Sequence, residues 1–79
     1  MKLVYFNDTG KEINIHPGTF LHGSKTSKEP IKPLEERVFE LPEGTYPWIK
    51  MWEYQGQLSI FVSGEKVNEQ ENDGHMKDF

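Results

Sequence analysis

The chain of 79 residues contains no cysteine, a single arginine and no long apolar run. The lack of cysteine excludes a disulfide framework and a thiolate zinc site. No apolar stretch approaches the roughly 20 residues of a membrane-spanning helix. The short apolar segment at residues 1–6 also does not resemble a signal peptide. We therefore expect a cytoplasmic protein with no membrane partner.

Positive charge is also scarce in this chain. Lysine and arginine number 9 against 13 aspartates and glutamates, which gives a net charge of −4. Binding to nucleic-acid phosphates needs a basic face, so we expect no nucleic-acid polymer as a partner. At this size folding removes only about 60% of the unfolded chain's surface. We therefore expect one small domain that is completed by forming a homo-oligomer.

Helical periodicity is missing, and an apolar pattern of period two takes its place. Turn-forming residues recur about every eight to twelve positions, which is typical of a small all-β sandwich or barrel. The sequence thus predicts a small β-sandwich of six or seven short antiparallel strands. The expected strands are residues 2–6, 11–16, 19–22, 36–41, 46–54 and 57–63. The first two are expected to pair as a hairpin.

Two polar segments are expected to lie outside the sheets. Residues 23–33 are rich in serine, lysine and proline, and this composition predicts a mobile surface loop. Residues 65–79 carry five acidic and two basic side chains and show no apolar period. Such a composition is typical of a disordered acidic tail. The expected domain therefore spans residues 1–64, with a tail at 65–79.

The longest expected strand carries an aromatic and basic stripe on one face, formed by Trp48, Lys50, Trp52 and Tyr54. Three interpretations are open. The two tryptophans belong to the core, because aromatic rings dominate small cores. Alternatively, the stripe is a binding surface, on which the rings stack or anchor a partner and Lys50 holds a phosphate or carboxylate. In the third, it is a face for self-association.

The remaining candidates for a site are isolated. Arg37 presents a planar fork that suits phosphate or carboxylate, or it forms a surface ion pair with one of the glutamates before it. His16 and His22 flank a Pro-Gly turn without a third ligand at a metal-site spacing, so we expect no metal and no cofactor. The chain has no cysteine nucleophile and no Gly-x-Ser-x-Gly elbow, and we expect that it is not an enzyme.

Two segments, LPEGTY at residues 41–46 and WEYQGQLSIF at residues 52–61, resemble the β-domain of the von Hippel–Lindau tumour suppressor family. The resemblance implies a prealbumin-like β-sandwich. That family reads hydroxyproline with a tryptophan, a serine and histidines. The matching positions here hold Ser59, Glu53, Trp52 and Gln57 instead, so the resemblance does not carry over this recognition.

Three functions follow from these observations. The first is a binding module without catalysis, which docks a protein partner through the aromatic-basic hairpin or the loop at 23–33. The second is an oligomeric protein of the kind encoded by phages and mobile elements, which sequesters a small nucleotide-like signalling ligand. Its site residues would be the aromatic stripe with Arg37. The third is a structural accessory oligomer without a ligand.

Overall fold

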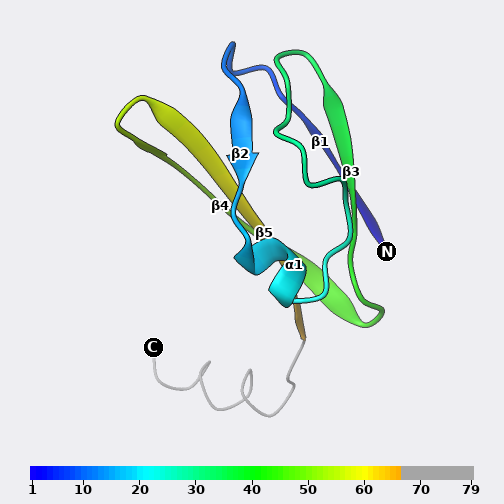
Figure 1. The fold of residues 1–79 in the computed structure, drawn as a ribbon. Helices are drawn as coiled ribbons and strands as arrows, with labels where there is room; N and C mark the ends of the chain where they lie inside the picture. Colours follow the sequence, from blue (N-terminus) through cyan, green and yellow to red (C-terminus); the bar gives the residue numbers. More distant parts are fainter. Residues whose placement is uncertain (67–79) are drawn as a thin grey trace, which may run out of the picture.

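The computed structural model describes residues 1–66, which form five strands and one helical turn (Figure 1). The elements are β1 (Lys2–Phe6), β2 (Ile13–Ile15), α1 (Gly18–Leu21), β3 (Glu36–Glu40), β4 (Thr45–Tyr54) and β5 (Gln57–Lys66). The prediction of a small all-β fold is confirmed. Strand β5 runs two residues past the expected domain end at 64, and the rest of the expected tail lies outside the described residues. None of the described residues belongs to a helix long and apolar enough to cross a membrane.

The strands form two sheets whose pairing differs from the expected hairpin of the first two strands. Strand β1 pairs antiparallel with β3, whereas β2 joins the sheet β2-β5-β4 and runs parallel to β5. The buried side chain of Asn7 explains the separation. Its Nδ2 donates to the carbonyls of Lys11, Ile31 and Lys32 at 2.8–3.1 Å. A tight turn is therefore replaced by a connection that crosses from one sheet to the other.

The expected strand at residues 19–22 is wrong, because α1 occupies this segment. Pro17 stands at the N-cap with a φ of −56°, the value to which its ring restricts the backbone. The amide of Phe20 donates to the carbonyl of Pro17 at 3.1 Å. The hydroxyl of Thr19 is buried and accepts the amide of Val62 at 3.0 Å, so the turn is fastened to β5.

One apolar cluster draws side chains from both sheets and from the segment between them. Its fully or almost fully buried members are Ile13, Ile31, Phe39, Leu41, Ile60 and Val62. Ile31 lies in the segment 23–33 that was expected to be a surface loop, and it is completely buried. A bridge of two backbone hydrogen bonds to Ile13, at 2.9 and 2.8 Å, holds it there. The segment is therefore partly a core element.

The hairpin of β4 and β5 forms where the sequence predicts it. Gln55 and Gly56 both have positive φ, at 52° and 79°, as the two central residues of a type I′ turn require. The register places Tyr54 opposite Gln57 and Lys50 opposite Phe61. This register sends Ile60 and Val62 into the core and leaves the aromatic stripe on the other face.

Candidate functional site

The two tryptophans lie on the face of β4 that points away from the core. Trp48 is 43% exposed and Trp52 is half-buried, and neither belongs to the core cluster. The interpretation that places them in the core is therefore wrong. The β1–β3 sheet covers only the opposite face of the hairpin, which carries Ile60 and Val62. The other two interpretations, a binding surface and a self-association face, stay predictions.

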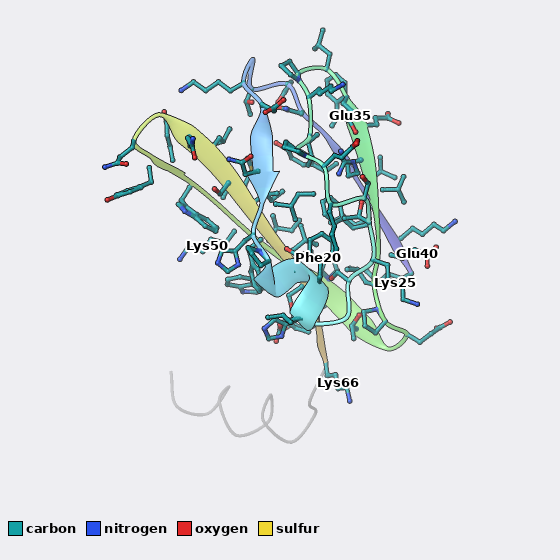
Figure 2. All side chains as sticks on the ribbon, viewed as in Figure 1. Phe20, Lys25, Glu35, Glu40, Lys50 and Lys66 are labelled. Atoms are coloured by element: carbon teal, nitrogen blue, oxygen red, sulfur yellow. The ribbon has the colours of Figure 1, made fainter. Side chains whose placement is uncertain are left out.

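The stripe borders a shallow hollow of about 360 Å³, whose lining residues are His16, Trp48, Lys50, Trp52 and Phe61. We call the ring of Phe61, which lines the hollow, its floor. This ring meets the Trp48 ring edge-to-face, with the two centroids 5.6 Å apart. The Nζ of Lys50 lies 5.7 Å from the centroid of the Trp52 ring. Figure 2 shows Lys50 on the hairpin, well separated from Glu35, which directly precedes β3. The hollow thus combines flat apolar walls with one cation.

Two residues that the sequence analysis did not place in the site complete the hollow. His16 packs edge-to-face on Phe61 and on Trp52, with centroids 5.8 and 5.7 Å apart. Its Nδ1 accepts the amide of Gly18 at 3.0 Å, which orients the ring. The alternation of β5 put Phe61 on the aromatic face, and that signal alone could have identified it. The position of His16 depends on the parallel pairing of β2.

Gly18 is required by this arrangement. A methyl group on Gly18 would lie 2.8 Å from the Phe61 ring and 3.0 Å from Nδ1 of His16. On the other side, His22 contacts Phe61 with centroids 5.6 Å apart. The first turn of α1 is therefore packed directly against the floor of the hollow.

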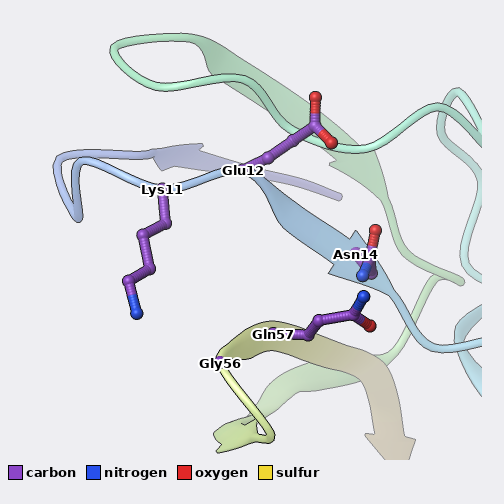
Figure 3. A pocket seen from close by; sticks show the side chains of 5 residues that line it. All are labelled: Lys11, Glu12, Asn14, Gly56 and Gln57. Carbon is purple, nitrogen blue, oxygen red and sulfur yellow. The ribbon is translucent and has the colours of Figure 1, made fainter.

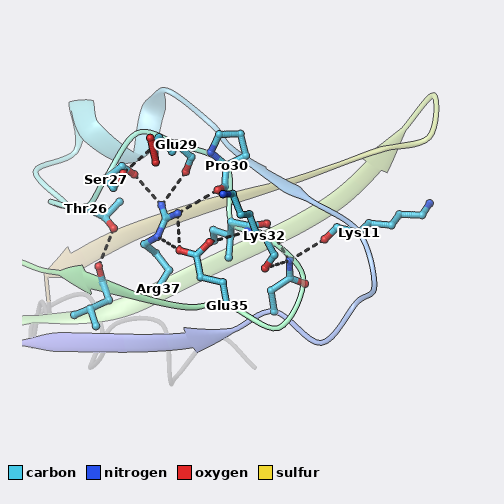
Figure 4. Close-up of polar contacts among 11 residues, drawn as sticks. Lys11, Thr26, Ser27, Glu29, Pro30, Lys32, Glu35 and Arg37 are labelled. Carbon is cyan, nitrogen blue, oxygen red and sulfur yellow. Dashed lines mark hydrogen bonds and ion pairs between the residues drawn. The ribbon is translucent and has the colours of Figure 1, made fainter.

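The remaining two predicted site residues lie outside the hollow. Tyr54 is 69% exposed at the hairpin turn, on the same face as Trp52. Arg37 is buried, and its guanidinium donates to the carboxylate of Glu35 and to three backbone carbonyls (Figure 4). Because these partners occupy the guanidinium donors, Arg37 is not available to a ligand in the hollow. Arg37 does form an ion pair, with Nη2 2.8 Å from Glu35, but the expected place at the surface is wrong, because Arg37 is buried.

Among residues 1–66, two groups have shifted pKa values, and both lie away from the hollow. A hydrogen bond from the amide of Lys32 lowers the pKa of the Glu35 carboxyl, and the Arg37 guanidinium lowers it further. Burial raises the pKa of the Tyr5 hydroxyl, with a smaller contribution from the Asp8 carboxylate. Both shifts belong to the framework between the sheets.

A second hollow, of about 420 Å³, lies between the start of β2 and the hairpin turn (Figure 3). It is lined by Lys11, Glu12, Asn14, Gly56 and Gln57. The Nζ of Lys11 is already paired with Glu53 at 2.7 Å. In the part of the chain that the structure describes, no three histidine, aspartate or glutamate side chains are grouped as a metal site. The aromatic hollow therefore remains the candidate site.

Comparisons with protein-family models, with curated proteins and with solved structures give no match to this chain. The resemblance to the von Hippel–Lindau β-domain accordingly stays a prediction. The candidate site rests on its geometry.

Proposed function

We propose that this protein is a small binding module without catalytic activity, and that it docks a protein partner on the aromatic hollow of the β4–β5 hairpin. The observation that carries the proposal is the placement of Trp48, Lys50 and Trp52 around one open hollow outside the core. Half-exposed tryptophans are costly to leave in water and are frequent anchors of protein interfaces. A lysine beside them supplies a charge that selects an acidic partner.

The shape of the surface favours an extended polypeptide segment as the partner. The hollow is open, and the exposed rings of Tyr46 and Tyr54 lie on the same face near its two ends. A chain with a carboxylate between apolar side chains would place the carboxylate at Lys50 and the apolar groups on the indoles. The loop at 23–33 is a poorer docking site, because Arg37 already binds three of its carbonyls.

A planar anion is the second candidate, favoured by the same lysine with its two neighbouring indoles. A nucleotide-like ligand could stack a base on Trp48 or Trp52 and direct its phosphate to Lys50. This is the sequestering function that the composition suggested, now with Arg37 outside the site. In either case we take the two sheets to be the layers of a small β-sandwich and the compartment to be the cytoplasm.

Tryptophan fluorescence tests the proposal, because both indoles line the hollow. The probes are an acetylated and amidated peptide of alternating leucine and glutamate with a central phenylalanine, and adenosine monophosphate. We expect saturable quenching by the peptide that is lost in Lys50→Glu and kept in Val38→Ala, an exposed site on the other sheet. Saturation by the nucleotide alone would favour the second candidate. Equal responses from Lys50→Glu and the wild type would contradict both.

A further inference from the structure

The unpaired edge of β4 is the feature from which a further inference follows. Within residues 1–66, β4 has β5 on one side and no strand on the other, and eight of its ten residues are exposed. Its backbone donors and acceptors on that edge are therefore free to pair with another strand. This inference does not depend on the proposed docking of a partner in the hollow.

The hydrogen bonds on the far side of β5 identify which backbone groups face β4. There the carbonyl of Ile60 accepts the amide of His16 at 2.8 Å, and the amide of Val62 donates to Thr19 Oγ1 at 3.0 Å. Backbone groups point to alternate sides along a strand. The amide and carbonyl of Phe61, which stands between these two residues, consequently point toward β4.

The same alternation applies to β4. Lys50 is opposite Phe61 in the register, so its amide and carbonyl point toward β5. Those of Ile49, Met51 and Glu53 then point to the free edge. Edge strands that avoid pairing carry proline or charge at such positions. On this edge Pro47 and Glu53 are of that kind, and Ile49 and Met51 between them are not.

We propose that β4 pairs antiparallel with β4 of a second copy of this chain, around a two-fold axis at Met51. In this register Ile49 of each copy is opposite Glu53 of the other, and Met51 is opposite itself. Ile49, Met51 and Glu53 of each copy then each donate one backbone hydrogen bond to the other copy and accept one from it. A two-fold axis at Ile49 would instead place Met51 opposite Pro47, which has no amide to donate. An axis at Glu53 would place two carboxylates opposite one another.

The aromatic face supports the same axis. Centred on Met51, the register places Lys50 opposite Trp52 of the second copy and Trp48 opposite Tyr54 of the second copy. These are non-hydrogen-bonded pairs, in which cross-strand side chains come closest. The first pair brings a lysine cation to an indole, and the second brings two aromatic rings together. An axis at Lys50 would set two ammonium groups together. The dimer would also join the two hollows into one continuous surface, to which each copy adds a tyrosine.

Substituting Met51 at the two-fold axis with a lysine or a glutamate tests the dimer. Met51 is 37% exposed and outside the core cluster, so Met51→Lys and Met51→Glu should fold and each be monomeric, because like charges would meet at the axis. An equimolar mixture should restore a dimer that contains one copy of each. Val38→Lys, at an exposed apolar position on the other sheet, should leave the dimer intact. The readout is sedimentation equilibrium, with monomers of 9.2 kDa.

Amide hydrogen exchange gives a second readout that needs no substitution. In the dimer, the amides of Ile49, Met51 and Glu53 should be protected from hydrogen exchange, and this protection should increase with protein concentration as the dimer fraction rises. In a monomer these three should exchange rapidly, while those of Lys50 and Trp52 stay protected by β5. A monomeric wild type, rapid exchange at all three positions, or a Met51→Lys variant that stays dimeric would each overturn the proposal. Fluorescence titration below the dimer dissociation constant would still report on the hollow.

Discussion

The polar segment 23–33 is held in place by buried contacts and the apolar β4–β5 hairpin is partly exposed, which is the reverse of what their compositions suggest. The segment is polar, yet the Arg37 guanidinium binds the carbonyls of Ser27, Glu29 and Pro30 at 2.8–3.2 Å. The hairpin is apolar and aromatic, yet Trp48 is 43% exposed and β4 has a free edge within the described residues. Buried polar contacts thus hold the polar segment in place, whereas the aromatic stripe of the hairpin faces outward.

This contrast locates stability and binding in different parts of the molecule. A buried polar group stabilises only while all its partners are present, and its removal leaves several groups unsatisfied. In the described residues no buried side-chain nitrogen or oxygen lacks a partner. Exposed rings, by contrast, contribute little to folding and remain available for contact. Removal of Arg37, the donor that holds the segment, should therefore unfold the protein, whereas substitutions of the exposed hairpin rings should abolish contacts.

The largest expected effect is that of Arg37→Ala. It leaves three loop carbonyls without their donor, and each buried polar group left without a partner costs about 1–3 kcal/mol. Since a domain of this size has a stability of only about 4–12 kcal/mol, the variant should be largely unfolded or close to it. Urea denaturation followed by circular dichroism measures this loss. The exposed Lys32→Ala serves as the control. An Arg37→Ala midpoint equal to that of the control would show that the segment does not depend on Arg37.

Gly18→Ala should have the next largest effect, because Gly18 lies against Phe61 and His16, which line the hollow. The added methyl group would press on Phe61 and His16, and overpacking of this kind costs about 1–3 kcal/mol. The floor of the hollow would shift with the ring, so the tryptophan emission should change together with the melting temperature. Gly10→Ala is a control without close neighbours, although its positive φ adds a cost of its own. An emission spectrum identical to the wild type would contradict the packing of α1 on the hollow.

Trp48→Ala should have a smaller effect on stability than on binding. The residue loses an edge-to-face contact with Phe61 and part of its burial, which we expect to cost about 1–2 kcal/mol. Binding of the acidic peptide probe should disappear while the circular dichroism spectrum is kept. Phe39→Ala provides the comparison, because that completely buried ring should cost about 3–5 kcal/mol. A loss as large as that of Phe39→Ala would place Trp48 among the structural residues after all.

The smallest expected effect is the pH dependence from Glu35. Its pKa is lowered in the folded protein from the ordinary value of 4.5. A carboxyl with a lowered folded pKa contributes stability above its unfolded pKa, and this contribution is lost as the pH falls through the folded pKa. Glu35→Gln should therefore flatten the acid side of the stability profile below about pH 4.5. Glu36→Gln removes an equal charge from an exposed position and should leave the slope unchanged.

Several parts of the fold follow directly from local chemistry. The predicted strand at 2–6 is observed as β1, and the expected strand at 36–41 is observed as β3, with Arg37 and Phe39 on the buried side. The hairpin turn at Gln55 and Gly56 also lies where it was predicted. These features depend on neighbours two to four positions apart, which a single sequence displays.

The pairing of the strands could not be predicted in this way. The contacts of β2 with β5 and of Ile13 with Ile31 join residues distant in sequence, and the parallel pairing of β2 decides which side chains meet His16. For the same reason the burial of Ile31 within a polar segment carries no local signal. In a strand with apolar residues on both faces, the alternation indicates on which face a tyrosine or tryptophan lies. It does not indicate whether a second sheet covers that face.

By itself, the sequence determined the all-β class, most strand limits and the grouping of Trp48, Lys50 and Trp52 on one face, because period-two alternation follows from strand geometry. Only the tertiary structure decided that Arg37 is internal and that, within the part of the chain it describes, this face is uncovered and β4 lies at an edge. Those outcomes depend on which face of each sheet packs against the other sheet. The packing that buries the whole cluster around Phe39 and Ile60 determines this choice.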